Sequence, residues 1–149
     1  MDMIRRNTDY ALRLMVNLAE RFGREAVSSR ILADKEDVSY QLACKLLQKL
    51  NAAGLVKSQM GPRGGFSLAQ IPSRINLSQV VEAIQGPVSV NCCLLGKEAC
   101  QRQSNCPISK KLAGLQDYIE GFLKSVTLEE LSQSKDAKSK VRKIRKGKK

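Results

Sequence analysis

The strongest constraint on this chain is a dense group of cysteines between residues 91 and 107. Four of its five cysteines lie there, as Cys92, Cys93, Cys100 and Cys106. Glycine and polar residues separate them without an apolar stripe, which is not the pattern of cysteines packed in a core. Thiolates at this density are typical of ligands to a soft metal centre, and we interpret the segment as a loop for an iron-sulfur cluster.

Two other interpretations of these cysteines remain open. Disulfides require an oxidising compartment, but residues 1–20 lack the basic segment and apolar run of an export signal, so we expect a cytoplasmic protein. Structural zinc also uses three or four cysteines, although the CxxC knuckles of zinc ribbons are absent. The chain has no histidine, which removes any site that depends on imidazole.

The charge of the chain indicates a polyanionic partner, and nucleic acid is the first candidate. The net charge is +12 for 149 residues, but nine Lys and Arg against one Asp in residues 135–149 account for +8 of it. Residues 134–149 contain too few apolar residues to fold, so we expect a disordered basic tail. No run of about 18 apolar residues occurs, so we expect no membrane span.

Hydrophobic spacing predicts three helices in the first 54 residues. Asn7 or Thr8 is the expected cap of the first helix, Ser28 caps a short second one, and the third begins at Ser39 and ends at Gly54. The outer face of the third helix carries the amide and cationic side chains Gln41, Lys45, Gln48 and Lys49. Two helices joined by a short turn, the second with such a face, form a helix-turn-helix pattern for DNA.

A β-hairpin is predicted directly after these helices. Residues 55–58 and 66–69 have the composition of short strands, and the glycine-rich turn Met60–Gly65 joins them. Arg63 then lies at the tip of a wing, where it can enter the narrow minor groove of DNA. A solvated surface arginine without a partner is the alternative.

Two more helices are predicted on either side of the cysteine loop. Asn76 with Gln79 begins one as a capping box, and Gly86 ends it. The other follows Pro107 and has a heptad pattern. Its apolar positions are Ile108, Leu112, Leu115, Ile119, Phe122 and Val126. Because fewer than three heptads are marginal alone, we expect this helix to pair with a second subunit, although the same pattern also serves packing on its own domain.

Several segments together resemble the winged-helix transcriptional regulators typified by IscR and NsrR. These are TDYALR at 8–13, LNAAGLVKS at 50–58, GPRGGFSLA at 61–69, INLSQVVEAIQGP at 75–87, and the spacing of Cys93, Cys100 and Cys106. The resemblance implies a homodimer that binds a pseudo-palindromic double-stranded DNA operator and holds one iron-sulfur cluster, 2Fe-2S or 4Fe-4S, per subunit.

The resemblance also implies roles for individual residues. Gln41, Cys44 and Lys45 fall where the family contacts bases, and Arg63 falls on the wing tip. We add Ser28, Ser39 and Tyr40, at the starts of the second and third helices, to the expected DNA-binding residues.

The chain departs from the IscR pattern at the cluster ligands. No histidine follows the third cysteine, whereas Asp9 lies in the first helix as in NsrR-like members, in which an Asp there can complete the cluster. Six residues instead of five separate Cys93 from Cys100, and the extra Cys92 leaves the first ligand ambiguous.

The sequence therefore predicts a mainly α fold with a winged helix-turn-helix domain (1–90), a cysteine loop (91–107), a dimerisation helix (108–133) and a basic tail (134–149). We expect a non-enzymatic repressor whose operator affinity depends on a cluster that senses nitric oxide, redox state or iron supply. The alternative is a cluster-free regulator that acts through thiol oxidation or a partner enzyme.

Overall fold

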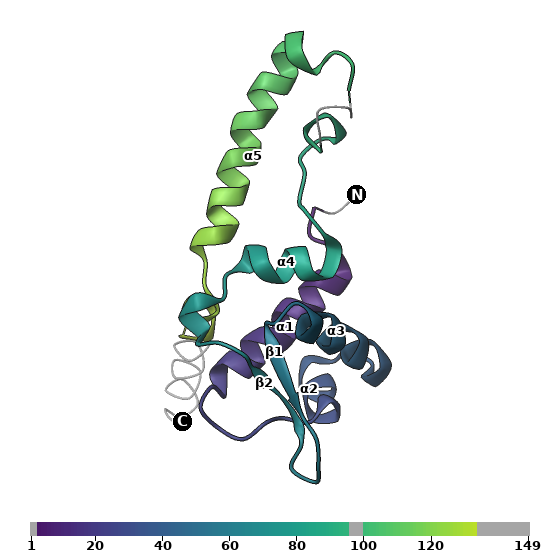
Figure 1. Cartoon of the computed structure of the whole chain (residues 1–149), viewed down its shortest axis with the longest axis vertical. Coiled ribbons are helices and arrows are strands. Elements are labelled where there is room, and N and C mark those ends of the chain that lie inside the picture. The colour runs from purple at the N-terminus through teal and green to yellow at the C-terminus, as the bar shows by residue number, and fades with distance from the viewer. Residues whose placement is uncertain (1–2, 96–99, 134–149) are drawn as a thin grey trace, which may run out of the picture.

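The computed structural model describes residues 3–95 and 100–133, and it confirms a mainly α, winged-helix fold (Figure 1). Its elements follow the order α1 (Arg6–Glu20), α2 (Ser29–Glu36), α3 (Tyr40–Ala52), β1 (Val56–Gln59), β2 (Gly65–Leu68), α4 (Leu77–Gln85) and α5 (Pro107–Ser125). Short 3₁₀ turns lie at Pro72–Arg74, Cys92–Leu94 and Gln103–Asn105. The basic tail predicted from residue 134 lies outside the described residues.

The core lies where α1 meets α2, α3 and α4. Apolar residues three and four apart on α1, among them Leu14 and Met15, are fully buried, and they meet Leu47 and Leu50 of α3 and Val80 of α4 in one cluster. Burial of these aliphatic side chains holds the helix-turn-helix in place, because each contributes roughly 1.5 to 3 kcal/mol of hydrophobic stabilisation.

The helix caps agree with the sequence except at the first helix. Ser28 and Ser39 accept hydrogen bonds from the amides of Ile31 and Leu42, and Asn76 forms a full capping box with its N3 residue. The predicted cap at Asn7 or Thr8 is wrong, because α1 begins at Arg6 with Arg5 as its N-cap, two or three residues earlier.

The side chain of Gln85 explains this difference. Its Oε1 accepts the Arg5 amide at 2.9 Å, and its Nε2 donates to the Met3 carbonyl at 2.9 Å. Gln85, at the end of α4, thus accepts from the amide of the N-cap residue, as the third helical residue does in a capping box. Thr8 is free to enter the helix, where it is fully buried.

The two strands form the predicted hairpin, with Val56 opposite Leu68 and Gln59 opposite Gly65. The hairpin is also attached to the chain before α2, because Val27 and Phe66 exchange two backbone hydrogen bonds of 2.9 and 2.8 Å. Gly65 makes this close approach possible. A Cβ atom there would lie 2.3 Å from the Val27 carbonyl oxygen, and its φ of +152° is one that glycine adopts most easily.

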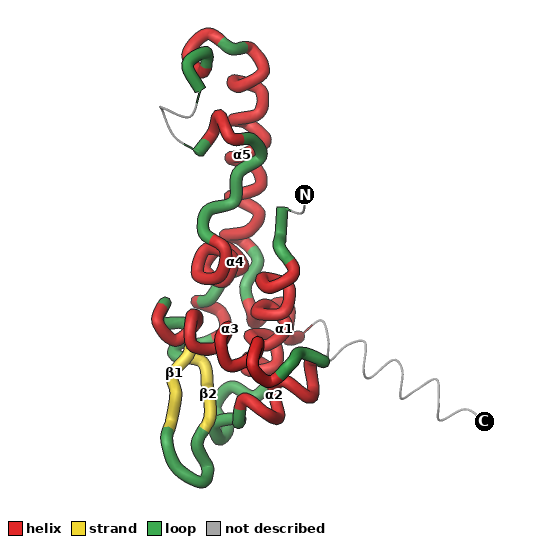
Figure 2. Tube along the Cα trace, turned by 90° about the vertical axis from the view of Figure 1, so that its right-hand side faces the viewer, coloured by secondary structure: helices red, strands yellow, loops and turns green. Residues whose placement is uncertain are grey.

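The long helix α5 projects from the rest of the molecule (Figures 1 and 2). The segment after α4 runs beside α5 as far as Leu95, and the chain returns to the core after the C-terminus of α5. There the Leu128 amide donates to the Ile75 carbonyl at 2.9 Å and the Leu128 side chain is fully buried. Within residues 3–95 and 100–133, no helix is long and apolar enough to cross a bilayer.

Candidate nucleic-acid interface and cysteine loop

The exposed face of α3 carries the side chains predicted to contact DNA. Ala43, Leu46 and Leu47 of α3 face the core, which leaves Gln41 and Lys45 exposed on the other side of the helix. Tyr40 is also exposed and lies under the Arg30 guanidinium, 5.0 Å from its ring centre. Cys44 is half-buried between the two faces.

The two cap serines have a different local role. The hydroxyls of Ser28 and Ser39 accept amide hydrogen bonds at the starts of α2 and α3, so these side chains stabilise the helices that form the motif. Their direct contact with DNA stays a prediction.

Arg63 lies at the tip of the hairpin, which extends away from the helices (Figure 2). Its side chain is 86% exposed, and its ion pair with Glu25, at 3.7 Å, is equally open to solvent. Exposed pairs of this kind contribute about 0 to 1 kcal/mol, so Glu25 does not hold Arg63 strongly.

A buried polar network joins α1 to the turn of the helix-turn-helix. Glu36, the last residue of α2, is almost fully buried. Its carboxylate pairs with the Arg13 guanidinium at 3.5 Å and accepts from Asn17 Nδ2 at 2.8 Å, while its carbonyl also accepts from Arg13. The Arg13 guanidinium also lies 5.6 Å from the Tyr10 ring centre. The sequence did not identify this network, since an Arg and a Glu 23 positions apart carry no periodic signal.

The cysteines of the loop are free thiols. Cys92 is exposed, and Cys93, Cys100 and Cys106 are half-buried. Soft thiolate donors suit an iron-sulfur cluster in kind. However, the described residues do not bring any three Cys, Asp or Glu side chains together in an arrangement that could hold a metal ion.

Asp9, the other predicted ligand, is exposed in the first turn of α1. The cluster site is therefore not preformed in the described part of this single subunit. Cys92, Cys93, Cys100, Cys106 and Asp9 stay predicted ligands.

Helix α5 has two distinct faces. Ser109, Gln116 and Leu123 face the rest of the described chain. Ser109 is buried there, and Gln116 hydrogen-bonds to residues 88–90. Large apolar side chains on the adjoining face lack cover, since Ile108, Leu115, Tyr118 and Phe122 are 66, 46, 72 and 55% exposed. Leu112 and Ile119 are half-buried beside them.

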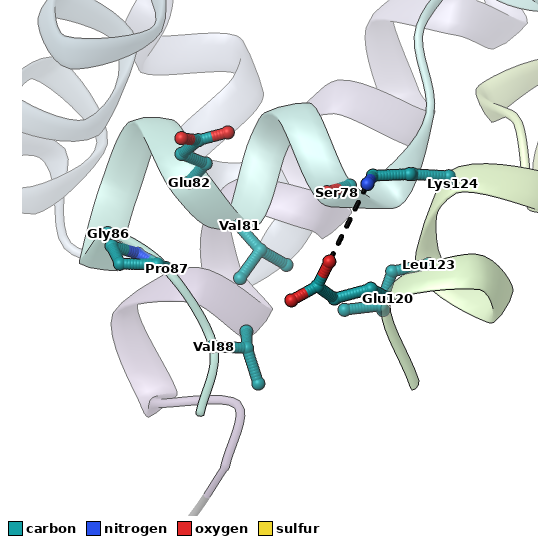
Figure 3. Close-up of a pocket in the computed structure, with 9 residues that line it drawn as sticks. All are labelled: Ser78, Val81, Glu82, Gly86, Pro87, Val88, Glu120, Leu123 and Lys124. Carbon is teal, nitrogen blue, oxygen red and sulfur yellow. Dashed lines mark ion pairs between the residues drawn. The ribbon is translucent and has the colours of Figure 1, made fainter. Parts of the chain in front are cut away.

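A cavity of about 220 Å³ separates α4 from the lower part of α5 (Figure 3). Val81, Val88 and Leu123 line it together with Glu120, which pairs with Lys124 at 3.6 Å. The pKa of the Glu120 carboxyl is lowered from its ordinary value, first by the hydrogen bond from Gln116 and then by the charge of Lys124. Glu120 is therefore a carboxylate at neutral pH.

Comparison with known proteins gives one consistent family. The model of the Rrf2 family, described as an iron-dependent transcriptional regulator, matches residues 4–134. The HTH-type transcriptional regulator IscR of Photorhabdus laumondii is 31% identical over 127 residues, which cover 85% of this chain and 77% of that protein.

Solved structures agree with this comparison. CymR, described as the global cysteine regulator of B. subtilis, has a TM-score of 0.73 at 27% identity and covers 90% of this chain and 98% of its own. T. potens IscR has a TM-score of 0.69 at 27% identity, with coverage of 90% and 87%. These relatives are transcriptional regulators, not enzymes.

Proposed function

This chain belongs to the Rrf2 family of transcriptional regulators, and we propose that it is a cytoplasmic, dimeric repressor whose operator affinity is controlled through its cysteine loop. The exposed polar face of α3 beside the projecting hairpin is the observation that carries the DNA-binding part. A helix fits the major groove, and a wing fits the adjacent minor groove.

We propose that Gln41 and Lys45 contact base edges while Arg63 enters the minor groove. An amide side chain pairs well with adenine and a cation with guanine or phosphate, which matches the chemistry of α3. The open position of Arg63, with only the weak Glu25 pair to break, supports its role at the wing tip.

The uncovered face of α5 supports a homodimer. Four large apolar side chains in a row on a helix that projects into solvent make a patch that soluble monomers rarely show. A second copy of the same helix would cover them by two-fold symmetry, since each patch is then complementary to itself.

For the sensor, we propose that Cys93, Cys100 and Cys106 hold an iron-sulfur cluster, with Asp9 or Cys92 as further ligand. A bound cluster would supply a centre that nitric oxide, oxidants or iron shortage can alter. The thiols would have to move together, because the described residues do not gather them. We propose that the Asp9 carboxylate reaches the loop from the second subunit of the dimer.

A second candidate is a cluster-free regulator in which the loop thiols respond to oxidation. The separate, unpaired and partly exposed thiols favour it, because a disulfide or a sulfenic acid then forms without an assembled metal site. Similarity to the cysteine regulator of B. subtilis is compatible with this candidate.

Anaerobic purification of the full chain separates the two candidates. A bound cluster predicts a coloured protein with iron and sulfide in equal amounts, both lost in the variant with Cys93, Cys100 and Cys106 replaced by Ser. Altered absorption or loss of iron in Cys92→Ser would assign Cys92 as a further ligand, and an unchanged cluster would leave that role to Asp9. A colourless protein whose DNA affinity changes with thiol oxidation supports the second candidate.

Selection from a random library of DNA duplexes tests whether the protein is a sequence-specific DNA-binding regulator. Enrichment of no common sequence would contradict that function.

A further inference from the structure

Gln116 makes three hydrogen bonds, two of which attach the first arm of the cysteine loop to α5. Its Oε1 accepts the Val90 amide at 2.9 Å, and its Nε2 donates to the Val88 carbonyl at 2.7 Å. The same Nε2 donates to Glu120 Oε1 at 2.9 Å. Gln116 therefore holds residues 88–90 against α5 through a backbone amide and a backbone carbonyl, the groups that pair in a β-sheet. This contact ends two residues before Cys92.

The chemistry of these contacts selects glutamine. The three partners are one N–H donor and two acceptor oxygens, so they need one acceptor and two N–H donors on a single side chain. A glutamine amide provides that set in one orientation only. Because Glu120 is charged and itself paired with Lys124, it fixes this orientation from one turn further along α5.

The second arm of the loop is anchored at the N-terminus of the same helix, whereas Gln116 lies at its middle. Cys106 is the N-cap of α5, and its carbonyl accepts the Lys110 amide. Cys106 and Gln116 are separated by ten residues of helix, which corresponds to a rise of about 15 Å. The two arms are therefore fixed at different heights on α5, which agrees with the absence of a gathered thiol group among the described residues.

We propose that Gln116 is a positioning residue that sets where the arm carrying Cys92 and Cys93 lies along α5, and with it the accessibility of the half-buried Cys93 thiol. The regulatory meaning of this assignment rests on the proposed function, but the anchoring does not. When the contacts to Val88 and Val90 open, the first arm can move towards the second and Cys93 loses its cover. That thiol then reacts faster, whether with an oxidant or with an incoming metal.

Gln116→Met tests the proposal, since it keeps the length of the side chain and removes all three hydrogen bonds. In the reduced full chain, iodoacetamide should alkylate Cys93 about 3 to 10 times faster than in the wild type, the range expected when one or two hydrogen bonds no longer oppose local opening. Cys44 in the same molecule is the internal reference and should keep its rate. The Val90 amide should exchange its hydrogen faster by a similar factor.

Gln116→Glu tests whether the hydrogen bonds themselves hold the arm, because glutamate has nearly the same size as glutamine and is also polar but has no N–H donors. It retains an acceptor for Val90 but places a negative charge against the Val88 carbonyl and Glu120, so it should also release the arm. Asp117→Ala, at an exposed neighbour on α5, is the matched control and should change neither rate. The Leu128 amide reports the core and should stay protected in every variant.

Unchanged Cys93 alkylation and Val90 exchange in either Gln116 variant would overturn the proposal. A failure of the proposed function would give a different result. The rates of Cys93 alkylation and Val90 exchange would change as predicted in the Gln116 variants, but the wild type would show no sequence-selective DNA binding.

Discussion

The Thr8 hydroxyl donates a 2.6 Å hydrogen bond to Gln85 Oε1, so the first turn of α1 is held by the last residue of α4. Gln85 stands directly before Gly86, where the chain leaves the core for the cysteine loop. Five residues after Thr8, α1 reaches the helix-turn-helix through the ion pair of Arg13 with Glu36. Helix α1 therefore connects the base of the cysteine loop with the DNA-binding motif by specific hydrogen bonds at both places.

Arg13→Ala should destabilise the fold more than Arg6→Ala. Both guanidinium groups lie 5.6 Å from the Tyr10 ring centre, but only Arg13 also reaches Glu36. Its loss leaves a buried carboxylate with fewer partners, at a cost of about 1 to 3 kcal/mol. Urea unfolding of both variants measures the difference, and equal midpoints would assign no role to the link with Glu36.

Arg63→Ala should weaken binding to the selected operator by about 1 to 3 kcal/mol, because a cation leaves the minor groove. Glu25→Ala is the matched control, since it frees Arg63 and should weaken nothing. Fluorescence anisotropy at moderate salt gives both affinities. An operator affinity unchanged by Arg63→Ala would exclude the wing tip from the interface.

Leu115→Asp with Phe122→Asp should yield monomers that no longer hold the operator. Two charges in an apolar interface cost far more than the roughly 0.5 kcal/mol of an ordinary surface change. Lys110→Asp is the control, because that exposed side chain lies off the apolar stripe of α5. Light scattering after size exclusion gives the mass, and a double variant that stays dimeric would move the interface elsewhere.

Gly65→Ala should lower stability by about 1 to 3 kcal/mol from its backbone angle alone, and the contact with Val27 adds to that cost. Gly114→Ala is the matched control, because the same substitution is made at a glycine in the middle of α5. A Cβ there meets nothing within 4 Å, and the change should stabilise α5 by about 0.8 to 1 kcal/mol. Thermal unfolding should thus move in opposite directions for the two variants. A neutral Gly65→Ala would mean that the hairpin is not held against Val27.

Asp9→Ala tests the remaining ligand. If the purified protein carries a cluster, this variant should keep it but show altered absorption and faster loss in air, since a hard carboxylate ligand is replaced by solvent. Asp34→Ala, another exposed aspartate on a neighbouring helix, is the control. Absorption, iron content and operator affinity identical to the wild type would reduce Asp9 to a charge at a helix start, worth about 0.3 to 1 kcal/mol.

Local chemistry made much of this fold predictable. Ser28, Ser39, Asn76 and Pro107 mark helix starts by interactions within a few residues, and all four mark them in the structure. The hairpin strands differ from the prediction by only one residue at each end. Heptad spacing identified the apolar stripe of α5, but not whether it would face a core or solvent.

Long-range polar contacts were not predictable in this way. Gln85, Glu36 and Gln116 each find their partners through the tertiary fold, at separations that no local rule covers. Thr8 is another example. Threonine often caps a helix, but here its hydroxyl donates to Gln85 of α4 and the residue lies inside α1. Cysteine density indicated a metal-binding loop, and the family resemblance supplied its ligand set. Both give the chemistry of the donors but not the distances between them.

The exchange of backbone hydrogen bonds between Val27 and Phe66 has a mechanical consequence for release from DNA. The hairpin is not a free arm that can detach while α3 stays bound, because it is joined to the segment that leads into α2. Tilting the helix-turn-helix by a small angle would move α3 and the hairpin together. Contacts of α3 and of the wing tip with DNA would then be lost together.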